Sequence, residues 1–294
     1  MTSIYKSEAS RRAVEERYRQ FLNHWPIPNR QLRLQTRQGE TFVVASGDER
    51  APALLLLHGS GANSASWMGD VAAWAEHFCV YAIDMIGEPG FSAASRPPLA
   101  SEAHALWLDD VLDALSLKRV SITGISLGGW LALDYATRRP TRVDALALLC
   151  PGGVGKQKNF LLKALPLLFL GAWGRRKMFE LVFGRRSSAP SPEAQAFGDF
   201  ISLIFAHFRP RRDKLPVFSD GALEKLTMPV LVILGGKDVL LDSQDSRRRL
   251  AKTVPHAEVD FLPDAGHVLL GHTARILSFL LRAGKSSDDV RQAS

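Results

Sequence analysis

The stretch VSITGISLGGWLALDY, residues 120–135, contains the turn around which the rest of the sequence can be placed. Its first residues are β-branched and apolar, which favours a buried strand, and its last residues have the apolar spacing of a helix. Ser126 lies between them, with Gly124 two residues before it and Gly128 two residues after it. Because small residues at both positions let strand and helix backbones approach closely, we expect a sharp turn that exposes the Ser126 hydroxyl. The alternative is a tight turn that needs glycines and holds an incidental serine.

Strand-like and helix-like segments alternate along most of the chain. Helix-like segments cover residues 64–77, 101–116 and 129–140; Ser101 suits a helix start, and the Arg-Arg-Pro ending at residue 140 suits a helix end. Short apolar strands between helices are typical of an α/β fold, in which helices cover both faces of a mostly parallel central sheet. Apolar runs predict these strands at residues 40–47, 52–59, 78–87, 119–124, 144–151, 228–236 and 257–263.

Composition favours a globular protein. The 294 residues are 46% hydrophobic and 23% charged, which excludes global disorder and suffices for a full core. The N-terminal segment is charged and amphipathic and does not have the pattern of a secretory signal. The longest apolar stretch, residues 160–173, is shorter than the roughly 20 residues that span a bilayer, and it contains Lys163 and Pro166. We therefore expect a soluble cytoplasmic protein.

Charge and cysteine patterns argue against several kinds of binding site. The net charge is +7, but residues 152–222 alone hold twelve Lys or Arg and five Asp or Glu, so the remainder of the chain is balanced. No recognition motif accompanies this excess, so we expect no nucleic-acid binding. Cys79 and Cys150 lie in separate apolar runs without the spacing of a metal site or a disulfide framework. We expect two buried thiols and no metal.

Polar residues with reactive side chains follow several of the predicted strands, where loops leave the carboxyl edge of a parallel sheet. A serine hydroxyl is a poor nucleophile until a base takes its proton. Of the eight histidines, His267 directly follows the last strand-like run, in FLPDAGHVLL. The others lie in helical or surface-like contexts, precede a strand, or occur in the His58-Gly59 turn. We predict that His267 is the base that activates Ser126.

That base needs a carboxylate to fix its tautomer and to stabilise its protonated form. Asp238 follows the strand-like run at residues 228–236, and we predict that it is this acid. The preceding run ends in LLCPGG and offers no acid. The order Ser126, Asp238, His267 matches one of the known chain orders of a Ser-His-Asp triad. The alternative acids are Asp242, Asp245 and the turn residue Asp264.

Triad chemistry also needs backbone amides that stabilise a tetrahedral oxyanion. The amide of Leu127, directly after Ser126, is one candidate, and the amide of Ser60, after His58 and Gly59, is the second. Glycines suit a loop that brings its backbone close to a ligand, although a glycine-rich turn without a ligand is the alternative. We expect His58 to support this loop and to take no part in the chemistry.

These motifs together resemble the α/β-hydrolase superfamily over residues 35–282. The resemblance rests on His58-Gly59 with Trp67, DMIGEPGFS at residues 84–92, GISLGG, GGKD and DAGH. Within the superfamily, residues 33–47 and 84–98 are similar to bacterial carboxylesterases of the naproxen-esterase kind. The family usually has Asp-x-x-Gly-x-Gly-x-Ser where this chain has Glu88-Pro89-Gly90. That departure leaves the shape of the loop and the role of Glu88 open.

The resemblance implies an enzyme in which Ser126 forms an acyl-enzyme and Asp238 orients His267. It also implies that the Ser60 and Leu127 amides hold the oxyanion and that no cofactor is needed. Haloalkane dehalogenase and epoxide hydrolase activities are disfavoured, because such relatives carry aspartate at the nucleophile position. The expected substrate is a carboxylic ester with an apolar acyl or aromatic part. Thioester hydrolysis, carbon–carbon bond hydrolysis, a lyase reaction and a non-catalytic ligand receptor on the same fold are the alternatives.

The family inserts a cap between two strands, which here predicts a helical lid at residues 152–222. The core then comprises residues 31–151 and 223–294, and residues 1–30 form a helical extension. Nine of the fifteen phenylalanines lie in the predicted lid, where they either cover a hydrophobic small-molecule substrate or pack the lid on the core. Its basic runs at residues 175–177, 185–186 and 209–212 either attract an anionic substrate or a membrane surface, or are merely solvated, which we favour. A homodimer is left open.

Overall fold

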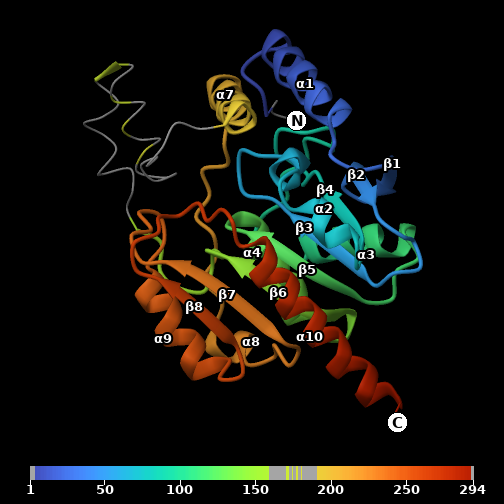
Figure 1. The fold of residues 1–294 in the computed structure, drawn as a ribbon. Coiled ribbons are helices and arrows are strands. Elements are labelled where there is room, and N and C mark those ends of the chain that lie inside the picture. The colour runs from blue at the N-terminus through green and yellow to red at the C-terminus, as the bar shows by residue number, and fades with distance from the viewer. Residues whose placement is uncertain are drawn as a thin grey trace.

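An eight-stranded sheet forms the centre of the structure, in the order β1-β2-β4-β3-β5-β6-β7-β8 (Figure 1). The computed structural model describes residues 4–158 and 191–292, together with residues 170, 171, 174, 177 and 180. β1 pairs with β2 and β2 with β4 in antiparallel fashion, and the remaining pairs are parallel, which confirms the predicted fold class. The strands are β1 (Asn29–Thr36), β2 (Gly39–Ser46), β3 (Ala53–Leu57), β4 (Cys79–Ile83), β5 (Val120–Ile125), β6 (Val143–Leu149), β7 (Val230–Gly235) and β8 (Glu258–Leu262).

Helices cover both faces of this sheet. Successive residues of its central strands point to opposite faces, and because both sets are apolar, both faces need to be covered. In β3, Leu55 and Leu57 join one apolar cluster, and Leu54 and Leu56 join the other. Helices that contribute to the first cluster are α3 (Ala103–Ala114), α4 (Leu127–Arg138) and α9 (Ser243–Thr253). Helices that contribute to the second are α1 (Glu8–Asn23), α2 (Val71–Ala75) and α10 (Thr273–Gln292). The short helix α8 (Asp220–Leu223) precedes β7.

Each predicted strand coincides with an observed one to within a few residues, but β1 escaped prediction. Its sequence NRQLRLQT holds only two leucines, both half-buried, because it is an antiparallel edge strand with one solvated face. The predicted helix at residues 64–77 is also interrupted. A 3₁₀ helix (Ser64–Trp67), capped by the Asn63 side chain, is followed by a turn at Gly69 and then by α2. Glycine is a poor helix former, which accounts for the break.

The N-terminal helix α1 lies against α7 (Pro192–His207), the helix described within the predicted lid (Figure 1). The Phe21 ring stacks on Phe200, with 4.9 Å between ring centroids. Just before α1, Tyr5 forms an antiparallel bridge with Phe208. The backbone of residues 4–6 therefore continues the contact between the N-terminal segment and the segment that follows α7. Phe200 and Phe208 are both buried in the apolar cluster that includes residues of α1, so these two phenylalanines pack α7 and the segment after it against the rest of the protein.

Much of the predicted lid lies outside the described residues. This applies to Phe160, Phe169, Phe179 and Phe183, and to the basic residues 175, 176, 185 and 186. Within the described part of the chain, no helix is long and apolar enough to cross a membrane.

Candidate active site

Ser126 occupies a strained turn between β5 and α4. Its backbone has φ 53° and ψ −107°, a conformation that non-glycine residues rarely adopt. The flanking glycines are required by close backbone contacts. A Cβ on Gly128 would lie 2.1 Å from the carbonyl oxygen of Leu57, and one on Gly124 would lie 2.7 Å from the carbonyl oxygen of Gly128. The strand and helix backbones therefore approach as closely at this turn as the sequence predicts, and Ser126 is half-buried at the carboxyl edge of the sheet.

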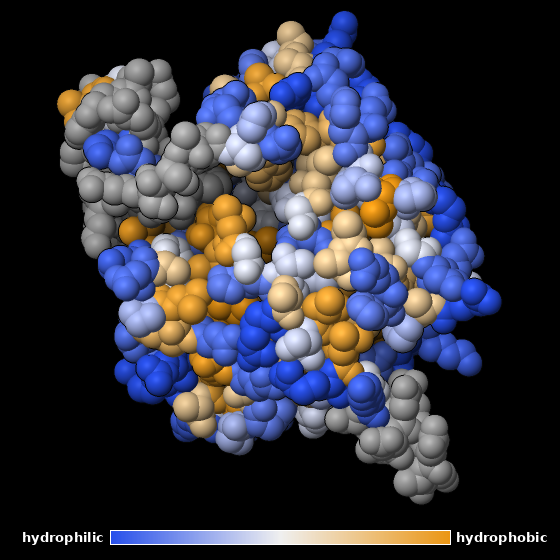
Figure 2. Space-filling view, in the orientation of Figure 1, coloured by the Kyte–Doolittle hydropathy of each residue, from blue (hydrophilic) through white to orange (hydrophobic). Residues whose placement is uncertain are grey.

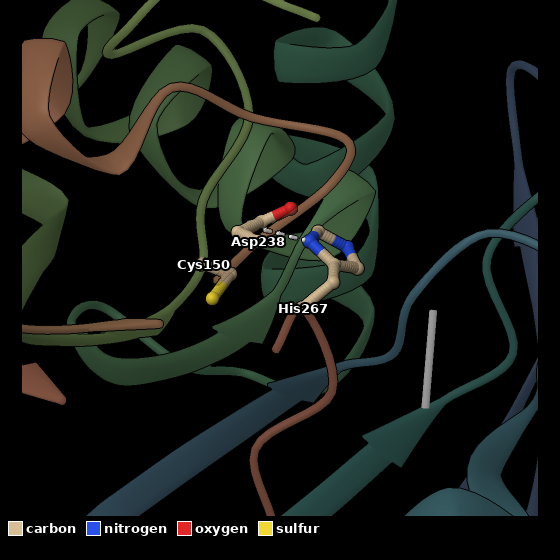
Figure 3. Close-up of side chains that lie close together, drawn as sticks. All are labelled: Cys150, Asp238 and His267. Carbon is tan, nitrogen blue, oxygen red and sulfur yellow. Dashed lines mark hydrogen bonds and ion pairs between the residues drawn. The ribbon is translucent and has the colours of Figure 1, made fainter. Parts of the chain in front are cut away.

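His267 and Asp238 meet Ser126 at this edge. The Ser126 hydroxyl oxygen lies 2.9 Å from Nε2 of His267, and Nδ1 of His267 lies 2.7 Å from Oδ2 of Asp238. Asp238 comes from the loop after β7, and His267 from the loop after β8. Both side chains are buried, and Figure 3 shows the carboxylate of Asp238 facing the imidazole ring. The structure therefore brings together the three residues that the sequence assigns to a triad.

The Asp238 carboxylate is held by further hydrogen bonds. The amides of Leu240 and Leu241 donate to its Oδ1 over 2.7 Å and 3.0 Å. Burial by itself raises the pKa of Asp238, but the hydrogen bond and charge of His267, with the two amides, lower the pKa overall. An ionised Asp238 accepts a hydrogen bond from the N–H at Nδ1 of His267, which leaves Nε2 without a proton and able to take one from Ser126.

The alternative acids have other partners. Asp242 caps α9 by accepting a hydrogen bond from the amide of Asp245. Asp245 in turn accepts from the amide of Lys156 over 3.1 Å. Asp264 is exposed and pairs with Lys237 over 2.6 Å. The contact with His267 therefore favours Asp238 over the other three.

Cys150 is a neighbour of this group that sequence reasoning missed. It follows β6 with φ 41°, and its side chain is buried, as predicted. Its sulfur, however, lies within 4.8 Å of a carboxylate oxygen of Asp238 and a ring nitrogen of His267 (Figure 3). Burial and the Asp238 carboxylate raise the pKa of the thiol. A metal at these three atoms would require the thiolate and would compete with the hydrogen bond that orients His267, so the arrangement suits proton transfer better than metal binding. The sequence signal that could have placed Cys150 near the site is its position at the end of a strand, like that of Ser126 and Asp238.

The loop after β3 lies beside Ser126. A Cβ on Gly59 would be 3.9 Å from the Cβ of Ser126, and the next residue, Ser60, is exposed. Leu127 is the first residue of α4, where helix amides have no partner within the helix. The two residues whose amides the sequence assigns to an oxyanion hole therefore lie in segments beside Ser126.

His58 supports this loop, as predicted. Its Nε2 accepts a hydrogen bond from the amide of Met85 over 3.0 Å, so its Nδ1 carries the proton and donates to the carbonyl oxygen of Gly59 over 2.8 Å. Burial lowers the pKa of His58, which keeps the ring neutral.

Glu88 also lies near the site, and its role is the one that the sequence left open. It is 3% exposed, and its Oε2 accepts hydrogen bonds from the amide of Gly61 over 2.6 Å and from the Ser60 hydroxyl over 3.3 Å. Burial raises its pKa to about 7, although the Gly61 amide and the charge of Arg96 act in the opposite direction. The signal in the sequence was the Glu-Pro-Gly departure from the family pattern.

An apolar side chain from α7 lies over the same loop. Phe205 is 48% exposed, and its ring would be 3.4 Å from a Cβ placed on Gly61. Further exposed apolar side chains are those of Val217 and Leu270, and Figure 2 shows hydrophobic residues at the surface below α7.

A mostly parallel sheet with a serine on a strained strand-to-helix turn, in contact with histidine and aspartate, defines the α/β-hydrolase class of proteins. The Alpha/beta hydrolase family model matches residues 54–278, and the chain belongs to this family.

Several of the similar proteins are bacterial carboxylesterases. Carboxylesterase YbfK of Bacillus subtilis (strain 168) is 30% identical over 278 residues, which cover 90% of this chain and 92% of that protein. A second protein of the same organism, named uncharacterized carboxylesterase nap, is 31% identical over 264 residues, which cover 86% of this chain and 85% of that protein. The crystal structure of naproxen esterase from Bacillus subtilis has a TM-score of 0.77 at 28% identity, covering 91% of this chain and 95% of that one. These findings confirm the prediction of an α/β-hydrolase enzyme that resembles carboxylesterases of the naproxen-esterase kind.

Proposed function

We propose that this enzyme hydrolyses carboxylic esters through an acyl-enzyme on Ser126. The observation that carries the proposal is the chain of hydrogen bonds from Ser126 through His267 to Asp238. The similarity to carboxylesterases over most of the chain supports ester hydrolysis as the reaction class.

In the first half of the reaction, the Ser126 oxygen attacks the ester carbonyl carbon while its proton passes to Nε2 of His267. Asp238 stabilises the imidazolium that forms. The tetrahedral oxyanion accepts hydrogen bonds from the Ser60 and Leu127 amides. When the ester C–O bond breaks, His267 returns the proton to the leaving alcohol oxygen.

In the second half, a water molecule attacks the acyl carbon and gives its proton to Nε2 of His267. The bond between the acyl carbon and the Ser126 oxygen breaks, the carboxylic acid leaves, and Ser126 regains its proton. No metal or cofactor takes part in this scheme.

The proposed substrate has an apolar acyl or aromatic part. Phe205, whose exposed ring lies at Gly61 beside Ser60, and Leu270, which is exposed in the loop that carries His267, support a hydrophobic substrate. A predicted lid at residues 152–222 that covers this substrate, and a cytoplasmic location, belong to the same proposal. Nucleic acid is not a partner in it, and the basic residues of the lid need no membrane surface.

The test is hydrolysis of p-nitrophenyl esters from acetate to dodecanoate by the wild type and by Ser126→Ala. We expect kcat to fall by at least about 10³-fold in the variant, because the nucleophile is lost. The chain length with the highest kcat/KM will measure the acyl pocket. Mass spectrometry after fluorophosphonate treatment should show one added group on the wild type and none on Ser126→Ala. Ester turnover that survives in Ser126→Ala would refute the acyl-enzyme.

Thioester and carbon–carbon bond hydrolysis remain the alternatives, because they use the same three side chains. Folded wild-type protein that binds the fluorophosphonate but hydrolyses no ester in the series would favour them. Protein that neither reacts nor turns over esters, but binds hydrophobic ligands tightly, would favour a receptor.

A further inference from the structure

Glu88 is a buried carboxyl that the reaction scheme above does not use. It lies in the loop after β4, and its side chain contacts the loop after β3, where Ser60 follows Gly59. Its two hydrogen bonds go to adjacent residues of that loop: one from the Ser60 hydroxyl and one from the Gly61 amide. A buried carboxyl is costly unless its hydrogen bonds are made, so the contact needs an explanation.

The loop that carries Ser60 has little of its own to hold it in place. Ser60 lies between two glycines, and Gly61 has φ +70°, a region open to glycine. Ser60 itself is exposed, so it gains no support from packing. His58 holds the start of the loop through the Gly59 carbonyl oxygen. Glu88 holds the peptide unit that follows Ser60, through the Gly61 amide, and it also contacts the Ser60 hydroxyl.

Glu88 is itself anchored on a rigid turn. The amide of Gly90 donates to the carbonyl oxygen of Glu88 over 2.9 Å, and a Cβ on Gly90 would lie 2.4 Å from Oδ2 of Asp84. The side-chain amide of Asn63 donates to the carbonyl oxygen of Pro89 over 2.9 Å, which ties the two loops together a second time. The Glu-Pro-Gly sequence thus gives the carboxyl a fixed base from which to hold Ser60.

We propose that Glu88 is a positioning residue for the oxyanion hole: its carboxyl holds Ser60 and Gly61 so that the Ser60 amide is aimed at the reacting carbonyl oxygen. The proposal rests on the proposed function, since it assigns Ser60 to that hole. When rotation of the loop misaligns the Ser60 amide, the transition state loses more stabilisation than the bound substrate does, so the effect should fall on kcat.

Two arginines offset the charge of Glu88. Arg96 and Arg211 both favour its ionised form, and they face it from the loop after β4 and from the segment after α7. Arg96 is fixed by donation to the carbonyl oxygen of Gly87 over 2.9 Å, and Arg211 by donation to Pro97 over 3.1 Å. The Ser60 hydroxyl and the Gly61 amide both donate to one oxygen of Glu88, so we expect the oxyanion hole to need an acceptor oxygen at residue 88. The side-chain amide oxygen of glutamine can also accept the hydrogen bond from the Gly61 amide, so a glutamine at residue 88 should preserve the position of Ser60.

The experiment compares Glu88→Ala and Glu88→Gln with the wild type in the full chain. The matched control is Asp134→Ala, which removes another buried carboxyl, on α4, that pairs with Arg138 over 2.8 Å. Steady-state kinetics on a p-nitrophenyl ester gives kcat and KM. Titration with phenylboronic acid, which forms a tetrahedral adduct with a serine hydroxyl, measures the oxyanion hole without requiring turnover.

We expect Glu88→Ala to lower kcat by about 10- to 100-fold, at most the effect of deleting one oxyanion donor, with KM changed by less than about threefold. Boronate affinity should fall by a similar factor. Glu88→Gln should retain both within about fivefold. Asp134→Ala should lose stability without this change in kcat or boronate affinity.

Wild-type kcat and boronate affinity in Glu88→Ala would overturn the proposal, as would an equal loss in Asp134→Ala or a loss confined to KM. If Glu88→Ala does not fold, a Glu88→Gln variant that is folded but as impaired as an oxyanion-donor deletion overturns it too. Wild-type protein that binds the boronate but hydrolyses no ester refutes ester hydrolysis, while the boronate affinities still test Glu88. Wild-type protein that neither binds the boronate nor hydrolyses an ester refutes both.

Discussion

Replacing Gly128 by alanine should damage both the fold and the activity, although it removes no catalytic group. The added Cβ would lie 2.1 Å from the carbonyl oxygen of Leu57 and 2.5 Å from that of His58. Ordinary contact would require these atoms to move apart by about 1 Å, and both belong to backbone that cannot swing away. The change therefore displaces the end of β3 relative to the start of α4.

The expected cost is about 2–3 kcal/mol in the free energy of unfolding, near the upper end for overpacking. For a chain of this size, such a loss lowers Tm by roughly 5 °C. Displacing the His58-Gly59-Ser60 backbone by about 1 Å relative to Ser126 should lower kcat/KM by about 10²-fold. Urea denaturation and p-nitrophenyl ester kinetics measure the two effects.

Gly69→Ala is the control, because a Cβ there would meet nothing within 4 Å. It should leave both measurements close to wild type. A wild-type free energy of unfolding together with wild-type kcat/KM in Gly128→Ala would refute the argument that the turn requires glycine at residue 128.

Two further predictions concern the carboxyl groups of the site. Asp238→Asn should lower kcat on p-nitrophenyl acetate by about 10³- to 10⁴-fold with an unchanged circular dichroism spectrum, since an amide that donates to Nδ1 favours the wrong tautomer of His267; near-normal turnover would instead reassign the acid. Burial raises the pKa of Glu88 from 4.5 to about 7, so the carboxyl loses its proton at a lower pH in the unfolded state than in the folded state. As the pH rises from 4.5 to 8, the wild type should therefore lose about 3 kcal/mol in its free energy of unfolding relative to Glu88→Gln. Urea denaturation at both pH values checks this, and a difference that is independent of pH would contradict the burial of an ionisable group there.

The sequence predicts the meeting of Ser126, Asp238 and His267 because it predicts the sheet. Each residue follows an apolar run, and the carboxyl ends of parallel strands lie along one edge. Residues separated by up to 141 positions are therefore brought within hydrogen-bond distance without any local signal between them. The choice of Asp238 over Asp242 followed from its place directly at the strand end, whereas Asp242 belongs to the next helix.

Contacts between loops could not be predicted in the same way. The Glu-Pro-Gly sequence was visible as a departure from the family pattern, but the hydrogen bond from Gly61 to Glu88 depends on how two loops fold against each other. Cys150 has an apolar run before it, so it was interpreted as a core thiol, and its approach to Asp238 depends on the positive φ that ends β6. β1 was missed because its exposed face carries no apolar pattern.

The contact of α1 with α7 bears on how members of this family could be recombined. The family match begins at residue 54, after α1, yet Phe21 stacks on Phe200 and Tyr5 bridges to Phe208. A chimaera that exchanged only residues 152–222 with a relative would pair a foreign α7 with a native α1 and leave mismatched aromatic rings between them. Exchanging residues 152–222 between relatives should therefore preserve stability only when the first 25 or so residues are transplanted with them.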